Sequence, residues 1–317
     1  MRSLATGVAG FIGSHLAERL LAEGHDVCGI DAFVDFYPRA IKEQNLKGPR
    51  AFDTFRFIEA NLLEIDLSLL LDDVEWVFHL AAQAGVRTSW GEAFSQYVDC
   101  NILATQRLLE AVRKRKEIQR FVYASSSSVY GKQQMVPLAE TMVPYPLSPY
   151  GVTKLTGEHL CQVYHQNFGL PIVSLRYFSV YGPRQRPDMA FHRFCQAVLA
   201  GQPLTIYGDV SNRRDYTYVV DVIEATLSAA KREAAIGEVI NIAGGAAVTL
   251  QEVIHLLQEI SGRSVPLSFV TKPYGDVEHT YADLHKAELL LGYHPTVALR
   301  HGLEQEFIAL SRYSRSV

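Results

Sequence analysis

The chain has 317 residues, of which 48% are hydrophobic and 20% charged, and its formal net charge is −4. A chain of this length can bury a large core, in one large domain or two unequal ones. The small net charge excludes a global basic field for nucleic acid or anionic lipid, so local arginines must hold any anionic ligand. No apolar run approaches the ~20 residues of a membrane span. We therefore expect neither nucleic acid nor a membrane as a partner.

The four cysteines, Cys28, Cys100, Cys161 and Cys195, are scattered without CxxC or Cys/His spacing. The sequence suggests neither a disulfide framework nor a zinc site, and a reducing cytoplasm fits best. A predicted strand begins within a few residues of Met1 and leaves no room for a signal peptide. We expect a cytoplasmic protein without a metal site.

The opening segment predicts a strand, a tight turn and a helix. Apolar residues at positions 4 and 5 lead into the turn, and apolar residues at positions 12, 16 and 20 then recur at helical spacing up to Gly24. A second strand is predicted at residues 26–30 and ends on Asp31. The turn carries a glycine lattice, Gly7-Val8-Ala9-Gly10-Phe11-Ile12-Gly13.

This lattice predicts a dinucleotide site. GxxGxxG alone is a weak signal, but here it lies between a strand and a helix, with an acid at the end of the next strand. The glycines let the backbone approach a pyrophosphate at the helix N-terminus, where amides and the helix dipole favour anions. Asp31 would then bind the adenosine ribose hydroxyls, although a solvated loop acid is the alternative. Because Ala32 and Phe33 follow, no adjacent cation awaits a 2′-phosphate, and the sequence favours NAD over NADP.

Strands and helices continue to alternate along the chain. Further apolar strands are predicted at residues 54–58, 74–80, 119–124 and 171–177, with helices at 93–112 and 149–168. This alternation predicts a doubly wound parallel sheet. After Tyr177 the rhythm breaks into a Pro/Arg-rich stretch at 181–188 and shorter elements. We expect a Rossmann domain over residues 1–178 and a smaller, mixed α/β substrate-binding region over residues 179–317, interwoven with it.

Tyr150 and Lys154 stand four residues apart and project from one helical face. A phenol titrates near about 10 in water, and a lysine ammonium and a nicotinamide cation beside it would lower that pKa. The pair then predicts a general base for oxidising an alcohol, instead of a chance surface pair. The serines at 125–128 would add a short hydroxyl donor, unless they form only a polar exit from a strand.

The strand at 76–80 is followed by small residues at the carboxyl edge of the sheet. These residues can line the bottom of a cofactor pocket, or they can form a plain strand-to-helix turn. His79 at this strand end is expected to be a packed residue without a chemical role.

Together these motifs resemble those of the extended short-chain dehydrogenases/reductases that act on nucleotide sugars, over nearly the whole chain. The resemblance rests on the glycine lattice, Asp31, His79-Leu80-Ala81-Ala82, Ser125 to Gly131, Tyr150 with Lys154, and Arg214-Asp215-Tyr216. Within that family, three segments look most like UDP-glucuronate 4-epimerases: Asp35-Phe36-Tyr37-Pro38, Gln83-Ala84-Gly85-Val86-Arg87, and Tyr181-Gly182-Pro183-Arg184-Gln185-Arg186-Pro187-Asp188-Met189.

The resemblance implies roles for individual residues. Tyr150 would be the base, Lys154 would hold the nicotinamide ribose and tune Tyr150, and Ser126 would share the proton of the sugar C4 hydroxyl. NAD would contact Gly7, Gly10, Phe11, Ile12, Gly13, Asp31, Leu80, Ala81, Ala82, Gln83, Tyr150, Lys154 and Tyr177. The UDP-sugar would contact Arg87, Ser126, Ser127, Ser128, Ser179, Arg186, Thr205, Tyr207 and Arg214. A homodimer through the helices at 93–112 and 149–168 is also implied.

Ser127 and Ser128 separate this chain from relatives by chemistry. Nucleotide-sugar 4,6-dehydratases place Asp-Glu, and UDP-glucuronate decarboxylases a Glu, just before the Val-Tyr-Gly of this loop. Serine hydroxyls can instead bind a substrate carboxylate, assisted by Ser179 and Arg186, although an arginine in such a loop is commonly a surface charge. We expect a UDP-glucuronate 4-epimerase that forms UDP-galacturonate through a 4-keto sugar. The alternatives are a UDP-glucose 4-epimerase, a UDP-glucuronate decarboxylase or a non-catalytic NAD-binding partner protein.

Overall fold

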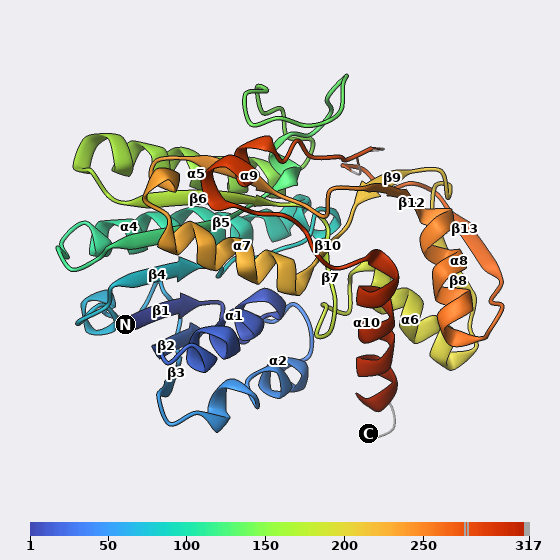
Figure 1. The fold of residues 1–317 in the computed structure, drawn as a ribbon, viewed down its shortest axis with the longest axis horizontal. Coiled ribbons are helices and arrows are strands. Elements are labelled where there is room, and N and C mark those ends of the chain that lie inside the picture. The colour runs from blue at the N-terminus through green and yellow to red at the C-terminus, as the bar shows by residue number, and fades with distance from the viewer. Residues whose placement is uncertain (276, 278, 314–317) are drawn as a thin grey trace.

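The computed structural model describes residues 1–275, 277 and 279–313. At its centre lies a seven-stranded parallel sheet with the strand order β11-β6-β5-β4-β1-β2-β3 (Figure 1). Its strands are β1 (Arg2–Thr6), β2 (Asp26–Asp31), β3 (Phe55–Glu59), β4 (Trp76–His79), β5 (Arg120–Ser126), β6 (Ile172–Tyr177) and β11 (Val239–Ile242). The α/β fold and the parallel Rossmann sheet that the alternation predicted are confirmed.

Helices cover both faces of this sheet. They are α1 (Phe11–Ala22), α2 (Arg39–Asn45), α3 (Phe94–Val98), α4 (Ala104–Val112), α5 (Pro149–Phe168) and α7 (Val219–Lys231). Successive strand residues face opposite sides, so Phe78 of β4 packs in a core with α1 and α7, while Val77 packs in a second core with α4 and α5. Because both faces of the central strand β4 are buried, its sequence is a nearly continuous apolar run, whereas the edge strand β3 is partly exposed.

One feature differs from the sequence prediction, and another bears on the predicted division into domains. The predicted helix at 93–112 is divided by a π-helical turn, Asp99–Leu103, between α3 and α4. The last strand of the sheet, β11, comes from beyond residue 178, so the division of the chain into domains at that residue stays a prediction.

Most of the remaining elements lie to one side of the sheet, at the right in Figure 1, whereas α9 (His285–Leu291) packs against β11. They form three two-stranded sheets: β7 with β10, β9 with β12, and β8 with β13. Their bounds are β7 (Val180–Tyr181), α6 (Ala190–Ala200), β8 (Leu204–Tyr207), β9 (Arg213–Asp215), β10 (Thr217–Tyr218), β12 (Ala247–Thr249), α8 (Leu250–Ser261), β13 (Leu267–Val270), α9 (His285–Leu291) and α10 (Leu299–Tyr313). The loop from β7 to α6 carries the predicted Pro/Arg-rich stretch.

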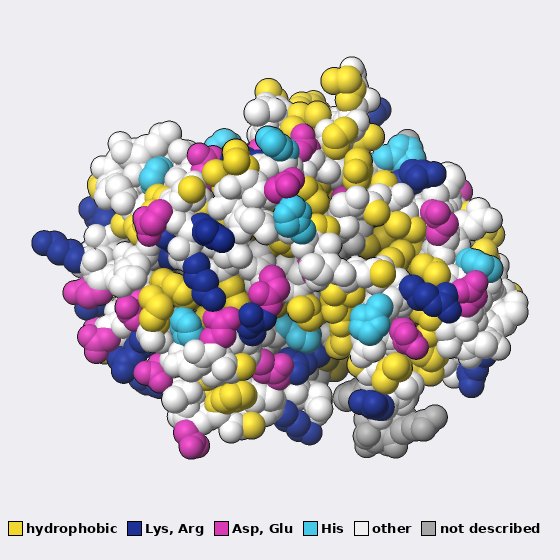
Figure 2. All heavy atoms as spheres, viewed as in Figure 1, with side chains coloured by type: hydrophobic (Ala, Val, Ile, Leu, Met, Phe, Trp, Pro, Cys, Tyr) yellow, Lys and Arg dark blue, Asp and Glu magenta, His cyan; other side chains and the backbone are white. Residues whose placement is uncertain are grey.

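Acidic and basic side chains are interspersed over the face shown in Figure 2, without a broad area of one sign. None of the helices in the described part of the chain is long and apolar enough to cross a membrane. Among those same residues, no cluster of three or more His, Cys, Asp or Glu side chains could hold a metal ion.

Candidate active site

The glycine turn between β1 and α1 has no room for side chains. Gly7 has a φ of +69°, and a Cβ there would lie 2.8 Å from the backbone of Ala81. At Gly13 a Cβ would lie 2.3 Å from the carbonyl oxygen of Gly7. Gly10 caps α1 without a side-chain hydrogen bond, so first-turn N–H groups are left for a ligand. A bare helix N-terminus against an open backbone fits a pyrophosphate.

Asp31 lies at the carboxyl end of β2, as predicted. Its carboxylate accepts hydrogen bonds from the backbone N–H of Ala9 at 3.0 Å and of Phe33 at 2.9 Å. Burial raises the pKa of Asp31, while these hydrogen bonds and the charge of Lys42 oppose the rise. Each carboxylate oxygen keeps a lone pair for a ribose hydroxyl.

Lys42 adds to the sequence argument, which considered only the residues that follow Asp31 and found no adjacent cation there. This lysine, from α2, lines the same cavity as Asp31. Its ammonium lies 4.7 Å above the ring of Tyr37, and it donates to the carbonyl of Val34. Preference for NAD over NADP therefore rests on the carboxylate of Asp31 and on the engagement of Lys42 elsewhere, not on a missing cation.

All the residues predicted to contact the cofactor border a single cavity of about 230 Å³. They are Gly7, Gly10, Phe11, Ile12, Gly13, Asp31, Leu80, Ala81, Ala82, Gln83, Tyr150, Lys154 and Tyr177. The structure adds Tyr37, Lys42 and Cys100, which were not predicted as site residues. The shape and polar groups of this cavity fit a dinucleotide.

Tyr150 and Lys154 lie on the first two turns of α5, whose N-cap Ser148 accepts a hydrogen bond from the amide of Gly151 at 3.1 Å. Lys154 is 3% exposed, and burial lowers its pKa to about 8. Burial also raises the pKa of Tyr150, against the lowering effects of a hydrogen bond with Ser126 and the charge of Arg186. In the protein by itself the Tyr150 pKa is thus raised, whereas the sequence argument expected a lowered value beside a nicotinamide cation.

Ser126 ends β5 and lies at the phenol of Tyr150. Its Oγ accepts a hydrogen bond from the backbone N–H of Ser128 at 3.1 Å. The Ser126 proton therefore remains available for donation to Tyr150 or to a bound sugar hydroxyl. The amide of Ser128 thus orients the hydroxyl that lies at the phenol of Tyr150.

A buried ion pair lies behind Lys154 and was missed by the sequence reasoning. Glu158, one turn further along α5, accepts hydrogen bonds from Arg176 at 3.0 and 2.8 Å, and from the hydroxyl of Ser125. The negative charge of Glu158 opposes the fall in the pKa of Lys154. The i,i+4 spacing of Lys154 and Glu158 was the available signal.

Asn101 of the π-helical turn ties three segments of the site together. Its side chain accepts from the amide of Gln83 at 2.8 Å and donates to the Gln83 carbonyl at 3.0 Å. It also donates to the hydroxyl of Thr153, the neighbour of Lys154, at 2.9 Å. The wide turn thus fixes the end of β4 relative to α5, a role that helical periodicity does not reveal.

His79 is a packed strand-end residue, as its position predicted. Its ring nitrogens lie 2.8 Å from the hydroxyl of Thr6 and 2.9 Å from that of Thr105. Burial lowers its pKa to about 3, so the ring is neutral near pH 7.

A second cavity, of about 700 Å³, lies between the sheet and the C-terminal elements. Its lining includes the predicted substrate residues Arg87, Ser127, Ser128, Ser179, Arg186, Thr205, Tyr207 and Arg214, while Ser126 lies at Tyr150. Two guanidinium groups stack on one ring here, because Arg87 and Arg193 lie 3.9 and 5.0 Å from the ring centroid of Tyr207. This wall of the cavity is both aromatic and cationic, and Arg193 was not predicted.

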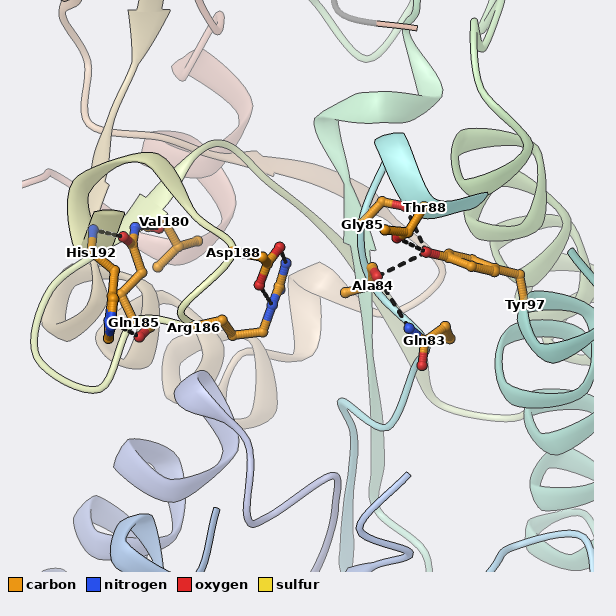
Figure 3. A network of polar contacts seen from close by, with 10 residues as sticks. All are labelled: Gln83, Ala84, Gly85, Thr88, Tyr97, Val180, Gln185, Arg186, Asp188 and His192. Atoms are coloured by element: carbon orange, nitrogen blue, oxygen red, sulfur yellow. Dashed lines mark hydrogen bonds and ion pairs between the residues drawn. The ribbon is translucent and has the colours of Figure 1, made fainter. Parts of the chain in front are cut away.

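Arg186 borders both cavities and is paired with Asp188. Its Nε and Nη2 donate to the two carboxylate oxygens of Asp188, each at 2.9 Å (Figure 3). The neighbouring Arg184 instead contacts Glu18 of α1 at 2.7 Å. Of the two loop arginines, the structure therefore brings Arg186 into the site.

A Rossmann sheet with a dinucleotide-shaped cavity, a Tyr/Lys pair and an adjoining cationic cavity defines an oxidoreductase-like site for a nucleotide sugar. The chain belongs to the NAD-dependent epimerase/dehydratase family of extended short-chain dehydrogenases/reductases. A family model described as GDP-mannose 4,6 dehydratase matches residues 4–306.

Individual relatives cover almost the whole chain. A Bacillus subtilis protein, the uncharacterized UDP-glucose epimerase YtcB, is 50% identical over 312 residues, which are 98% of each chain. The UDP-glucuronate 4-epimerase of Thermodesulfobacterium geofontis is 36% identical over 95% of this chain and 94% of its own. The crystal structure of the Bacillus cereus UDP-glucuronic acid 4-epimerase, with UDP-glucuronic acid and NAD, is 49% identical with a TM-score of 0.96, covering 99% of this chain and 100% of its own.

Proposed function

We propose that the chain is an NAD-dependent UDP-sugar 4-epimerase that interconverts UDP-glucuronate and UDP-galacturonate. The observation that carries this proposal is the polar wall beside Tyr150. There Ser127, Ser128, Ser179 and Arg186 line one cavity. Three hydroxyls and a guanidinium suit a carboxylate, and the Asp and Glu of dehydratases and decarboxylases are replaced by serines.

The chain's own residues can manage the proton of the sugar C4 hydroxyl. When bound, NAD accepts a hydride from C4 and later returns it to the opposite face of the sugar. Tyr150 takes the hydroxyl proton, and Ser126, held by the amide of Ser128, orients the exchange. The charge of Arg186 favours the Tyr150 phenolate, and Lys154 is placed to hold the ribose.

The nucleotide would occupy the far wall of the larger cavity. Arg87, Arg193 and Arg214 supply positive charge for the diphosphate. Tyr207 and Thr205 of β8 lie beside them and fit the uridine. Anchoring at the UDP end leaves the sugar free to turn over, which a 4-epimerase requires.

A UDP-glucose 4-epimerase is the second candidate, and two observations favour it. The 50% identical relative is described as a UDP-glucose epimerase. Asp188 also neutralises Arg186, so a sugar without a carboxylate would not meet an unpaired charge. This chain lacks the Glu that a decarboxylase places before the Val-Tyr-Gly of the loop, which argues against decarboxylation. The intact Tyr150, Lys154 and Ser126 argue against a non-catalytic NAD-binding protein.

One incubation tests the proposal. Purified protein is mixed with NAD and either UDP-glucuronate or UDP-glucose, and the products are separated and identified. We expect UDP-galacturonate from the first sugar, at a higher kcat/KM than any product from the second, and no net NADH. UDP-galactose as the preferred product would replace the proposal with the second candidate, and a UDP-pentose would identify a decarboxylase.

We also propose a homodimer in the cytoplasm. Exposed apolar side chains occur on the helices expected to form the interface, at Phe94, Leu103, Val152 and Val163. All four cysteines are free, which is compatible with a reducing compartment. Sedimentation tests the assembly, and a monomer at micromolar concentration would contradict it.

A further inference from the structure

Arg186, the cation assigned to the sugar carboxylate, already holds a carboxylate of the protein. Asp188 takes the edge of the guanidinium that carries Nε and Nη2, with both contacts at 2.9 Å. Figure 3 shows the two side chains facing each other in parallel, fork against fork. This is the geometry that a bound sugar carboxylate would itself adopt.

The backbone around Arg186 is fixed at several points. The amide of Gly182 donates to buried Glu306 at 2.8 Å, and the Gln185 side chain bonds to Val180 and to the amide of His192, each at 2.9 Å. The amide of Met189 closes a turn on the carbonyl of Arg186 at 3.1 Å. The backbone that carries Arg186 is therefore held in place when its anion changes.

Asp188 has more freedom than its partner. Its side chain is 39% exposed, against 22% for that of Arg186, so it can turn into solvent and remain hydrated. Two carboxylates on one guanidinium would leave a net negative charge. Their mutual repulsion would weaken the binding of each to Arg186. A mostly buried guanidinium without any anion is also unfavourable. One anion at a time is therefore the stable arrangement.

We propose that Asp188 is an exchangeable counter-ion of Arg186, which binds the guanidinium while the sugar carboxylate is away and yields when it arrives. The inference rests on the proposed function, in which the 4-keto sugar turns over and its carboxylate must leave Arg186 during the turn. At that stage the carboxylate of Asp188 neutralises the positive charge of Arg186, and this speeds the rotation of the 4-keto sugar. It is a positioning residue and does not itself touch the reacting atoms.

Asp188→Asn separates these effects, because the amide oxygen can still accept a hydrogen bond from Arg186 but carries no charge. Without competition, UDP-glucuronate should bind ~2- to 5-fold more tightly, the scale of a partly exposed ion pair. Turnover should fall, because the sugar carboxylate leaves Arg186 more slowly. UDP-glucose, which lacks the carboxylate, should show less than about a twofold change in either quantity.

The affinities are measured by calorimetry with NAD-loaded protein that carries Tyr150→Phe, so that no turnover occurs, and kcat is measured with Tyr150 intact. Glu18→Gln is the matched control, because it removes the partner of Arg184 in the same loop, and it should leave both quantities unchanged. Arg186→Ala is measured in parallel.

Tighter binding together with lower kcat, for UDP-glucuronate alone, supports the exchange. Weaker binding in Asp188→Asn, similar to that of Arg186→Ala, overturns it and makes Asp188 a fixed support. If Arg186→Ala discriminates between the sugars but Asp188→Asn changes nothing, the exchange alone is wrong. If Arg186→Ala does not alter the preference between the sugars, the carboxylate site of the proposed function fails, and the exchange fails with it.

Discussion

Tyr97 of α3 places its ring against that of Tyr150, with centroids 6.2 Å apart and an interplanar angle of 74°. Its hydroxyl donates to the carbonyls of Ala84 and Gly85, at 3.0 and 2.8 Å, and lies 2.6 Å from the hydroxyl of Thr88 (Figure 3). The ring of Tyr150 and the loop that follows β4 are thus supported by one aromatic side chain. The ring of Tyr150 is fixed by packing, independently of its hydroxyl.

Tyr150→Phe should therefore keep the ring contact and remove only the proton acceptor. We expect turnover to fall ~100- to 10,000-fold, the usual effect of losing a general base, while NAD remains bound. Rates are measured by product separation and NAD binding by calorimetry. Lys154→Met is the comparison, and it should also weaken NAD. Activity of Tyr150→Phe within threefold of the original would exclude Tyr150 as the base.

Asp31→Ala should weaken NAD and relax discrimination against NADP. The substitution removes the acceptor for the ribose hydroxyls and the negative charge that repels a 2′-phosphate, while Lys42 stays in the same cavity. The measured quantity is the ratio of the two dissociation constants. Adding Lys42→Met to Asp31→Ala should reverse part of the gain in NADP affinity. An unchanged ratio in Asp31→Ala would mean that another residue determines the selectivity for NAD over NADP.

Much of the cofactor cavity could be predicted from the sequence because its residues follow strand ends. In a parallel sheet the carboxyl ends of the strands meet at one edge, so the turn at Gly7, Asp31 and the segment after His79 necessarily converge. The helical spacing of Tyr150 and Lys154 predicted that their side chains lie on one face of a helix. These features depend on local periodicity and on one topological rule.

The charge pairing of the site was not predictable in this way. Lys42 of α2 lines the same cavity as Asp31 only because of the fold, and Glu158 meets Arg176 of β6 only once α5 packs on the sheet. Asp188 stands two residues from Arg186, yet no spacing rule for loops says that they pair. Ion pairs between separate elements are set by packing geometry, which composition and periodicity do not contain.

Two histidines with strongly lowered pKa values, His79 and His15, predict how stability depends on pH. The pKa of His79 is lowered to about 3 and that of His15 to about 4, whereas an unfolded histidine titrates near about 6.5. Below that pH the unfolded chain binds protons that the native protein excludes. The contribution of each of these histidines to the free energy of unfolding should thus fall as pH decreases from about 6.5, by up to ~1.4 kcal/mol per pH unit, whereas buried carboxyls with raised pKa values, such as Asp215, act in the opposite direction.

His79→Gln should remove one of these two contributions. Urea unfolding at pH 7, 6 and 5 measures the effect, and the difference in slope between the two proteins isolates His79 from all other groups. The variant should lose stability at pH 7, because contacts to Thr6 and Thr105 are altered, but its stability should fall less steeply between pH 6 and 5. Equal slopes would show that His79 is protonated in the native protein.

Arg186→Ala tests how the site handles its reactive intermediate. Oxidation of glucuronate at C4 gives a β-keto acid, which loses carbon dioxide when the breaking bond aligns with the carbonyl π system. In the proposed function, the residues that hold the carboxylate away from that alignment are Ser127, Ser128, Ser179 and Arg186, which line one cavity. The substitution should raise KM for UDP-glucuronate ~10-fold or more, the scale of a lost charge-assisted hydrogen bond, and raise KM for UDP-glucose much less. It should also release a 4-keto pentose together with NADH that is not reoxidised, detected by mass spectrometry and by absorbance.

Arg184→Ala is the control, since that guanidinium faces Ser14 and Glu18 of α1, and it should leave the sugar preference unchanged. An unchanged preference without pentose in Arg186→Ala itself would favour the UDP-glucose 4-epimerase.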